Sequence, residues 1–352
     1  MTEAKTLPVV RGGSALATIG PGARSLIGRM VSDALGVPYQ AAGAPVTLHR
    51  IGDYEFCDAD FRQILLWAEQ VGESPEYVVE CFAAADSGDP EDRLSFEVVD
   101  GRILKLVWDL AAMPIDLFEC REPLRITHLM FEGSSDGQRL TELRLTGCKG
   151  LVYLDCSSNF LTELNLSAVS GLRELRCYHN QLTALDLSAV PELRELWCHY
   201  NQLTELDLSP VTDLRILSCG NNPLTELGLS AVPELETLSC SENQLTELDL
   251  SALPELETLS CVGNQLTVLD LSAVPELETL SCVGNQLTEL DLSAVPELET
   301  LWCQYNQLTG LDLSAVPELQ KLSCHHNQLT ELDLSNHPQL KPTVDTHVIL
   351  RR

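Results

Sequence analysis

Leucine, cysteine and asparagine recur at a fixed spacing through the second half of the chain. Nine cysteines, from Cys156 to Cys324, follow one another at intervals of 21 residues, and nine asparagines, from Asn159 to Asn327, keep the same interval. Within each copy a short alternation of apolar and polar residues, as in Leu238-Ser-Cys240, is typical of a strand with one buried face. The period indicates a tandem array of identical structural units.

One repeat, residues 235–255, shows how such a unit would fold. Asn243 follows the strand, and its amide can bond backbone groups where the chain turns. A second short alternation, Leu248-Asp-Leu250, brings the chain back, and Pro254 turns it toward the next coil. A single coil cannot bury its own leucines, whereas stacked coils bury them against their neighbours. The pattern therefore predicts a parallel solenoid over residues 151–339.

The repeated segment resembles the leucine-rich repeat family, whose hallmark is L-x-x-L-x-L/C-x-x-N-x-L. The motif stands here as LVYLDCSSNFL over residues 151–161, and nine copies follow one another up to Asn327. The 21-residue period and the LTxLDLS return segment are most similar to bacterial members. The resemblance implies a curved solenoid with a parallel β-sheet on its concave side, and a role in holding another protein.

The segments on either side of the array are less regular. Asp100-Gly101 is a strong turn signal between two apolar runs and predicts a hairpin over residues 96–108. Residues 126–145 are similar to a degenerate first coil. Because the open ends of an array would expose leucines and unpaired strand edges, we predict an N-terminal cap over residues 95–150 and a C-terminal cap over residues 340–352.

Residues 1–94 predict a small, mainly helical region of unknown role that matches no family by its residues. Helices are expected over residues 23–36 and 61–70. A third helix is expected from Ser74-Pro75 to about Ala85, with serine at the N-cap and proline at the first helical position.

The charge of the chain narrows its partners and its location. Acidic residues outnumber basic ones by 52 to 22, giving a formal net charge of −30. Such a field repels phosphate backbones and anionic lipid, which argues against nucleic acid and membranes and favours a basic or mixed-charge protein partner. The chain has neither a run of about 18 apolar residues nor a signal-peptide pattern. A cytoplasmic monomer is expected, and delivery as an effector by a signal-less route is left open.

The cysteine ladder is interpreted as packing. A buried thiol behaves as a small hydrophobic group, neighbouring strands lie about 4.8 Å apart, and a disulfide needs Cβ atoms nearer 3.8 Å. Zinc needs four tetrahedral ligands, so neither a metal nor another cofactor is expected. The return-segment aspartates, from Asp186 to Asp333, are interpreted as a solvated outer face, with weak cation binding as the alternative.

Catalytic signals are weak. Gly20 to Ser25 lacks the spacing and the lysine of a phosphate-binding loop. His49, Cys57 and Cys81 could form a cysteine–histidine nucleophile pair, but nothing in their spacing supports one. An enzyme whose active site lies in residues 1–94, with the repeats selecting its substrate, remains an alternative.

Certain coils carry bulky side chains at strand positions that point away from the core, whereas the coils at 235, 256 and 277 carry threonine, serine and glycine there. Exposed aromatic residues beside arginines are typical of interface anchors. We therefore predict a partner-binding surface on the concave sheet. The residues assigned to it are Tyr153, Arg173, Arg176, Tyr178, His179, Arg194, Trp197, His199, Tyr200, Arg215, Trp302, Tyr305, His325 and His326.

This surface favours a non-enzymatic protein-binding scaffold. One alternative is repeat drift, in which the bulky residues merely cover one another. Another is a passive surface: an acidic nucleic-acid mimic, or an array that binds ice or cations. The threonine and serine run spans three coils before Trp302 interrupts it, which weighs against ice.

Overall fold

The computed structural model divides the chain into two compact units. The described residues of the first unit are 48–84, 97–99, 102–110, 113, 115, 119–132 and 144–151, and those of the second are 117–118, 139–143 and 152–351. The helix expected over residues 23–36 lies outside the described residues.

The first unit combines hairpins with two helices. Its elements are β1 (Leu48–Ile51), β2 (Tyr54–Cys57), α2 (Asp58–Val71), α3 (Pro75–Ala84), β3 (Glu97–Val99), β4 (Arg102–Asp109) and β6 (His128–Glu132). The predicted second and third helices are confirmed as α2 and α3, and the hairpin around Asp100-Gly101 is confirmed as β3 and β4, which pair antiparallel. The hairpin formed by β1 and β2 was not predicted, and the role of β3 and β4 as a cap stays a prediction.

Aromatic side chains form the core of the first unit. The rings of Trp67 and Trp108 meet edge to face with centroids 5.5 Å apart, and Phe82 lies within 6 Å of both. The indole of Trp67 and the amide of Gln63 both donate to the carbonyl of Glu119. These contacts join α2 and α3 to the strand β4 and to the segment after Phe118.

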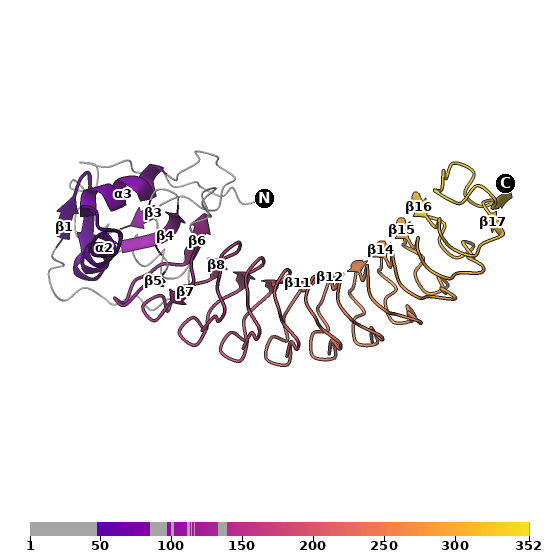
Figure 1. Ribbon diagram of the computed structural model, residues 1–352, viewed down its shortest axis with the longest axis horizontal. Helices are drawn as coiled ribbons and strands as arrows, with labels where there is room; N and C mark the ends of the chain where they lie inside the picture. Colours follow the sequence, from indigo (N-terminus) through magenta and orange to yellow (C-terminus); the bar gives the residue numbers. More distant parts are fainter. Residues whose placement is uncertain are drawn as a thin grey trace, which may run out of the picture. The chain divides into compact units, whose positions relative to one another are not determined.

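The second unit is a solenoid whose strands lie along the inner side of its curve (Figure 1). Its three-residue strands are β8 (Tyr153–Asp155), β9 (Glu174–Arg176), β10 (Glu195–Trp197), β11 (Ile216–Ser218), β12 (Thr237–Ser239), β13 (Thr258–Ser260), β14 (Thr279–Ser281), β15 (Thr300–Trp302) and β16 (Lys321–Ser323). Each pairs in parallel with the next at the same repeat position. The predicted parallel solenoid with a concave sheet is confirmed.

The interior of each coil is held by leucines and by the ladder asparagine. Asn243 is typical: its amide donates to the carbonyls of Cys219 and Cys240 at 3.2 and 3.0 Å, and its oxygen accepts from the backbone N–H of Leu224 at 3.2 Å. The side chain therefore bonds two successive coils at a buried position, where unpaired backbone groups are costly.

The return segments do not form a strand over most of the array, although their apolar and polar residues alternate. From Leu161 to Pro317 the described return segments contain no strand, and in most coils an aspartate oxygen accepts a hydrogen bond from the N–H two residues later. Asp186 and Ser188 are typical, at 2.9 Å. Hydrogen bonds from the side chain and from the backbone N–H of Ser188 lower the pKa of the Asp186 carboxyl. The last return segment does form a strand, β17 (Glu331–Asp333), which pairs with β18 (Ile349–Arg351). Before the array, β5 (Leu117–Glu119) pairs with β7 (Glu142–Arg144).

Candidate partner-binding face

Trp197 and Trp302 lie on the same face of the sheet. Each is the third residue of its strand, and the strand register joins them through one column of small side chains. That column is Ser218, Ser239, Ser260 and Ser281. Trp197 is half-buried and Trp302 is 39% exposed. The two side chains are five coils apart, about 24 Å by strand spacing, so both can face a single partner.

Five rings from two adjacent coils form what we call the first aromatic cluster: Tyr178, His179, Trp197, His199 and Tyr200. Tyr178 stacks on His199 at 4.6 Å between ring centroids, and His179 stacks on Tyr200 at 4.2 Å. Both pairs are close to parallel, with interplanar angles of 6° and 10°. Burial, with the neighbouring His179, lowers the pKa of His199, which favours the neutral form of the His199 ring.

Tyr153 corrects one expectation, because its side chain is buried with 5% exposure. Its hydroxyl lies 3.4 Å from Asp155, and burial raises its pKa. The guanidinium of Arg176 lies over the Tyr153 ring at 5.6 Å and over the Trp197 ring at 5.8 Å, while Glu174 accepts from Arg176 at 2.7 Å. Tyr153 therefore supports Arg176 from beneath and offers little surface to a partner.

The three arginines at the second position of the coil lie beside the strands and are exposed. Arg173 faces Glu192 at 3.4 Å and Arg215 faces Glu236 at 2.6 Å. From Glu236 onward the same column becomes acidic, so the charge along this edge changes sign midway through the array. The column consists of Arg173, Arg194, Arg215, Glu236, Glu257, Glu278 and Glu299.

A second aromatic cluster consists of Tyr305, His325 and His326. The ring of Tyr305 lies 4.4 Å from that of His326 and 5.4 Å from that of His325. Tyr305 is 54% exposed. The backbone N–H of His326 donates to Asp345 at 2.8 Å, which fixes this end of the cluster.

Four of these rings stand at a repeat position whose backbone conformation suits glycine better than a bulky residue. Every residue that comes two positions after a ladder cysteine is left-handed, with φ between 52° and 66°. Glycine occupies the position at Gly263 and Gly284, where it is unstrained. A bulky side chain at such a φ is an outlier that the surroundings must hold in place. Rings stand there at His179, Tyr200, Tyr305 and His326.

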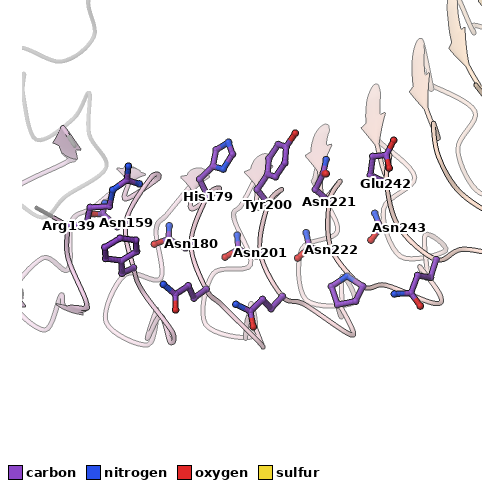
Figure 2. Close-up of a pocket in the computed structure, with 15 residues that line it drawn as sticks. Arg139, Asn159, His179, Asn180, Tyr200, Asn201, Asn221, Asn222, Glu242 and Asn243 are labelled. Atoms are coloured by element: carbon purple, nitrogen blue, oxygen red, sulfur yellow. The ribbon is translucent and has the colours of Figure 1, made fainter. Parts of the chain in front are cut away.

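A shallow groove of about 730 Å³ runs along the edge of the first aromatic cluster. In Figure 2, His179, Tyr200, Asn221 and Glu242 stand in one row, with the ladder asparagines in a second row below them. The other wall contains residues that sequence reasoning did not single out, although their repeat position already varies along the chain. They are Phe160, Gln181, Gln202, Pro223 and Gln244.

The thirteen cysteines all lie among the described residues, and none forms a disulfide. Burial raises the pKa of the ladder thiols, to about 12 for Cys198 and Cys261. Among the described residues no group of three or more histidine, cysteine, aspartate or glutamate side chains is arranged to hold a metal ion. The ladder thiols are placed as packing groups.

His49 and Cys57, two of the three residues considered for a cysteine–histidine pair, contact different acidic side chains in the first unit. His49 contacts Asp58 at 2.5 Å, whereas the thiol of Cys57 donates to the buried carboxylate of Asp60 at 2.8 Å. Arg102 in turn contacts Asp60 at 3.0 Å. Desolvation is the main reason that the pKa of Cys57 is raised, which opposes thiolate formation.

Comparison with known proteins identifies the repeats. The family model for leucine-rich repeats matches residues 170–210, 191–231, 233–274 and 275–316. The repeats within residues 170–231 and 233–316 are therefore leucine-rich repeats. A search of the curated proteins gives no match. No helix within the described residues is long and apolar enough to cross a membrane.

Solved structures agree with this assignment. The functional domain of InlJ from Listeria monocytogenes, which includes a cysteine ladder, is 32% identical with a TM-score of 0.57, over 68% of this chain and 60% of that one. A leucine-rich repeat protein of Leptospira interrogans is 22% identical with a TM-score of 0.54, over 63% and 66%. This chain thus spans less than two thirds of either. An internalin of Listeria monocytogenes, 16% identical with a TM-score of 0.55 over 81% and 92%, shares the fold.

Proposed function

We propose that this protein is a non-enzymatic scaffold that binds another protein on the concave sheet of its solenoid. The first aromatic cluster would supply the main contacts, with Arg176 and the exposed arginine column beside it. Trp302 and the second aromatic cluster would supply a further contact about 24 Å away. Aromatic and arginine side chains dominate binding energy at protein interfaces.

The observation that carries this proposal is the exposure of large rings in a strained backbone conformation. Tyr200 is 48% exposed with φ 54°, and Tyr305 is 54% exposed with φ 58°. Neither the packing of the coil nor the turn needs a ring there, since Gly263 and Gly284 fill the same position. Strain that stability does not require is typical of functional sites.

The charge and the thiols support finer features of the proposal. A net charge of −30 favours a basic or mixed-charge partner and faster association at low salt. Thirteen free cysteines fit a reducing compartment such as the cytoplasm. We further propose that the protein acts as a monomer.

The test uses the partner recovered by affinity capture and mass spectrometry. The double variant Trp197→Ala with Tyr200→Ala should weaken binding of the purified partner at least about tenfold, the usual scale for losing an anchor. The matched control is Thr258→Ala with Ser260→Ala, on the same face where side chains are small. Unchanged binding by the aromatic variant, or an equal loss in the control, would contradict the proposal.

A further inference from the structure

The groove runs along the stack of coils, which suits a segment that extends in the same direction. From Phe160 to Gln244 it is lined by five successive coils, and so extends about 19 Å by strand spacing. The groove is shallow and open to solvent, so an extended chain can lie along it and contact each coil in turn.

The spacing of the coils distinguishes between two extended conformations of a bound segment, the polyproline II helix and the β-strand. A polyproline II helix turns once in three residues, about 9.3 Å, and two coils of the solenoid extend about 9.6 Å. Residues i and i+3 of such a segment would therefore meet equivalent positions two coils apart. A β-strand repeats its side chains every 6.6 Å or so, which matches neither one coil nor two.

The walls of the groove have the chemistry that a polyproline II segment requires. Its backbone makes no internal hydrogen bonds, so its carbonyls need donors, and Gln181, Gln202 and Gln244 are exposed carboxamides in three of the coils. The exposed rings of Phe160 and Tyr200 provide apolar faces against which proline rings pack. Proline has no N–H, so each proline in the groove needs no acceptor.

The floor is occupied internally and offers little to a ligand. Asn201 is typical. Its amide donates to the backbone carbonyls of Cys177 and Cys198, both at 3.0 Å, and its oxygen accepts from the backbone N–H of Leu182, in the preceding coil, at 3.0 Å. Recognition must therefore come from the walls, which differ from coil to coil, and not from the floor, which is constant.

Charge sets which proline-rich segment would fit. The exposed carboxylate of Glu242 lies at one end of the groove, against Gly263, where an added Cβ would lie 2.5 Å from it. At the other end the guanidinium of Arg139 donates to the carbonyl of Ser158 at 2.9 Å and lies over the Phe160 ring at 5.3 Å. The cation is thus engaged by the chain itself, whereas the Glu242 carboxylate is exposed at the opposite end of the groove.

We propose that this groove binds a proline-rich segment in the polyproline II conformation, with a lysine or arginine of that segment beside Glu242. The inference rests on the proposed function, because the groove shares His179 and Tyr200 with the concave face. It adds the conformation and composition of the partner segment.

The probe is a fluorescent oligoproline of about ten residues flanked by arginines, titrated with the full chain and followed by anisotropy. Two comparison peptides keep the length: one replaces the prolines with glycine and serine, and the other replaces the flanking arginines with glutamates. We expect the arginine-flanked oligoproline to bind at least about tenfold more tightly than either.

Variants locate the binding. Tyr200→Ala and Glu242→Gln should each weaken the oligoproline about fivefold or more, whereas Tyr305→Ala, at the same left-handed position outside the groove, should leave it unchanged. Circular dichroism melts confirm that each variant folds. Equal binding of the glycine–serine peptide, an equal loss in Tyr305→Ala, or no binding at all would overturn the inference. The proposed function would survive those results if the Trp197 and Tyr200 double variant still released the recovered partner.

Discussion

Raising the pH should unfold the solenoid through its buried thiols. Desolvation raises the pKa of all nine ladder cysteines above the ordinary value of 9.0, and eight of them have no exposed surface. These are Cys156, Cys177, Cys198, Cys219, Cys240, Cys261, Cys282 and Cys303. Because each pKa is higher in the folded chain, the stabilisation is complete below about pH 9 and is lost as the pH rises toward 12.

The size of the effect follows from proton linkage. A thiol of pKa 9.0 in the unfolded chain gains about 1 kcal/mol of ionisation free energy between pH 9 and 10, while its folded counterpart stays protonated. Eight such thiols remove about 8 kcal/mol from the free energy of unfolding, against a typical total of about 5–15 kcal/mol. We therefore expect the folded array to fail near pH 10.

Denaturant melts followed by circular dichroism, at pH 7 to 10 with a reductant present, measure this loss. A double variant, Cys240→Ala with Cys261→Ala, isolates the thiols from tyrosines and lysines, since it should lose about 2 kcal/mol less than the wild type between pH 9 and 10. A free energy of unfolding that changes equally in both proteins would refute the reasoning. So would ladder thiols that react with a thiol reagent in the folded protein as fast as free cysteine does.

Two further predictions concern single positions. Asn243→Ala should lower the free energy of unfolding by about 2–4 kcal/mol, because it leaves the carbonyls of Cys219 and Cys240 without their side-chain donor. The control, Gln244→Ala at the neighbouring exposed position, should change it by no more than about 0.5 kcal/mol in denaturant melts. Equal losses would contradict the role of the asparagine. Gly284→Ala should lower the free energy of unfolding by about 1 kcal/mol, because alanine is strained in the left-handed backbone at this position. Tyr305→Gly should lower it by less. The opposite order in thermal melts would show that the Tyr305 ring contributes to stability.

The sequence predicted the stack and its concave face because burial repeats with the period of the coil. Leu238 and Cys240 lie in the core at every copy of their position, so one repeat determines all of them. The same logic placed Trp197 and Trp302 on one face, because in-register strands keep a repeat position in one column. Periodicity carries no such information for positions whose residue changes from coil to coil.

Those variable positions account for the errors. Tyr153 was expected to be exposed, yet its side chain is buried. Arg176, which lies over its ring, is a residue that the other coils do not carry at that position. The groove wall was missed because its shape depends on side chains such as Phe160 and Pro223 standing at one position in successive coils. The left-handed backbone could have been inferred from Gly263 and Gly284 at the position that Tyr200 and Tyr305 also occupy.

Repeat drift explains the rings less well than selection does. The coils at 256–276 and 277–297 are identical except at Val268 and Glu289, and both carry glycine where the backbone is left-handed. The array therefore contains coils that meet the needs of folding with small residues alone. Placing a tyrosine at that φ adds strain on the order of 1 kcal/mol or more and exposes a large ring to water. A change that costs stability and exposes apolar surface, clustered in adjacent coils at two places, is expected where a partner binds and supports the proposed function.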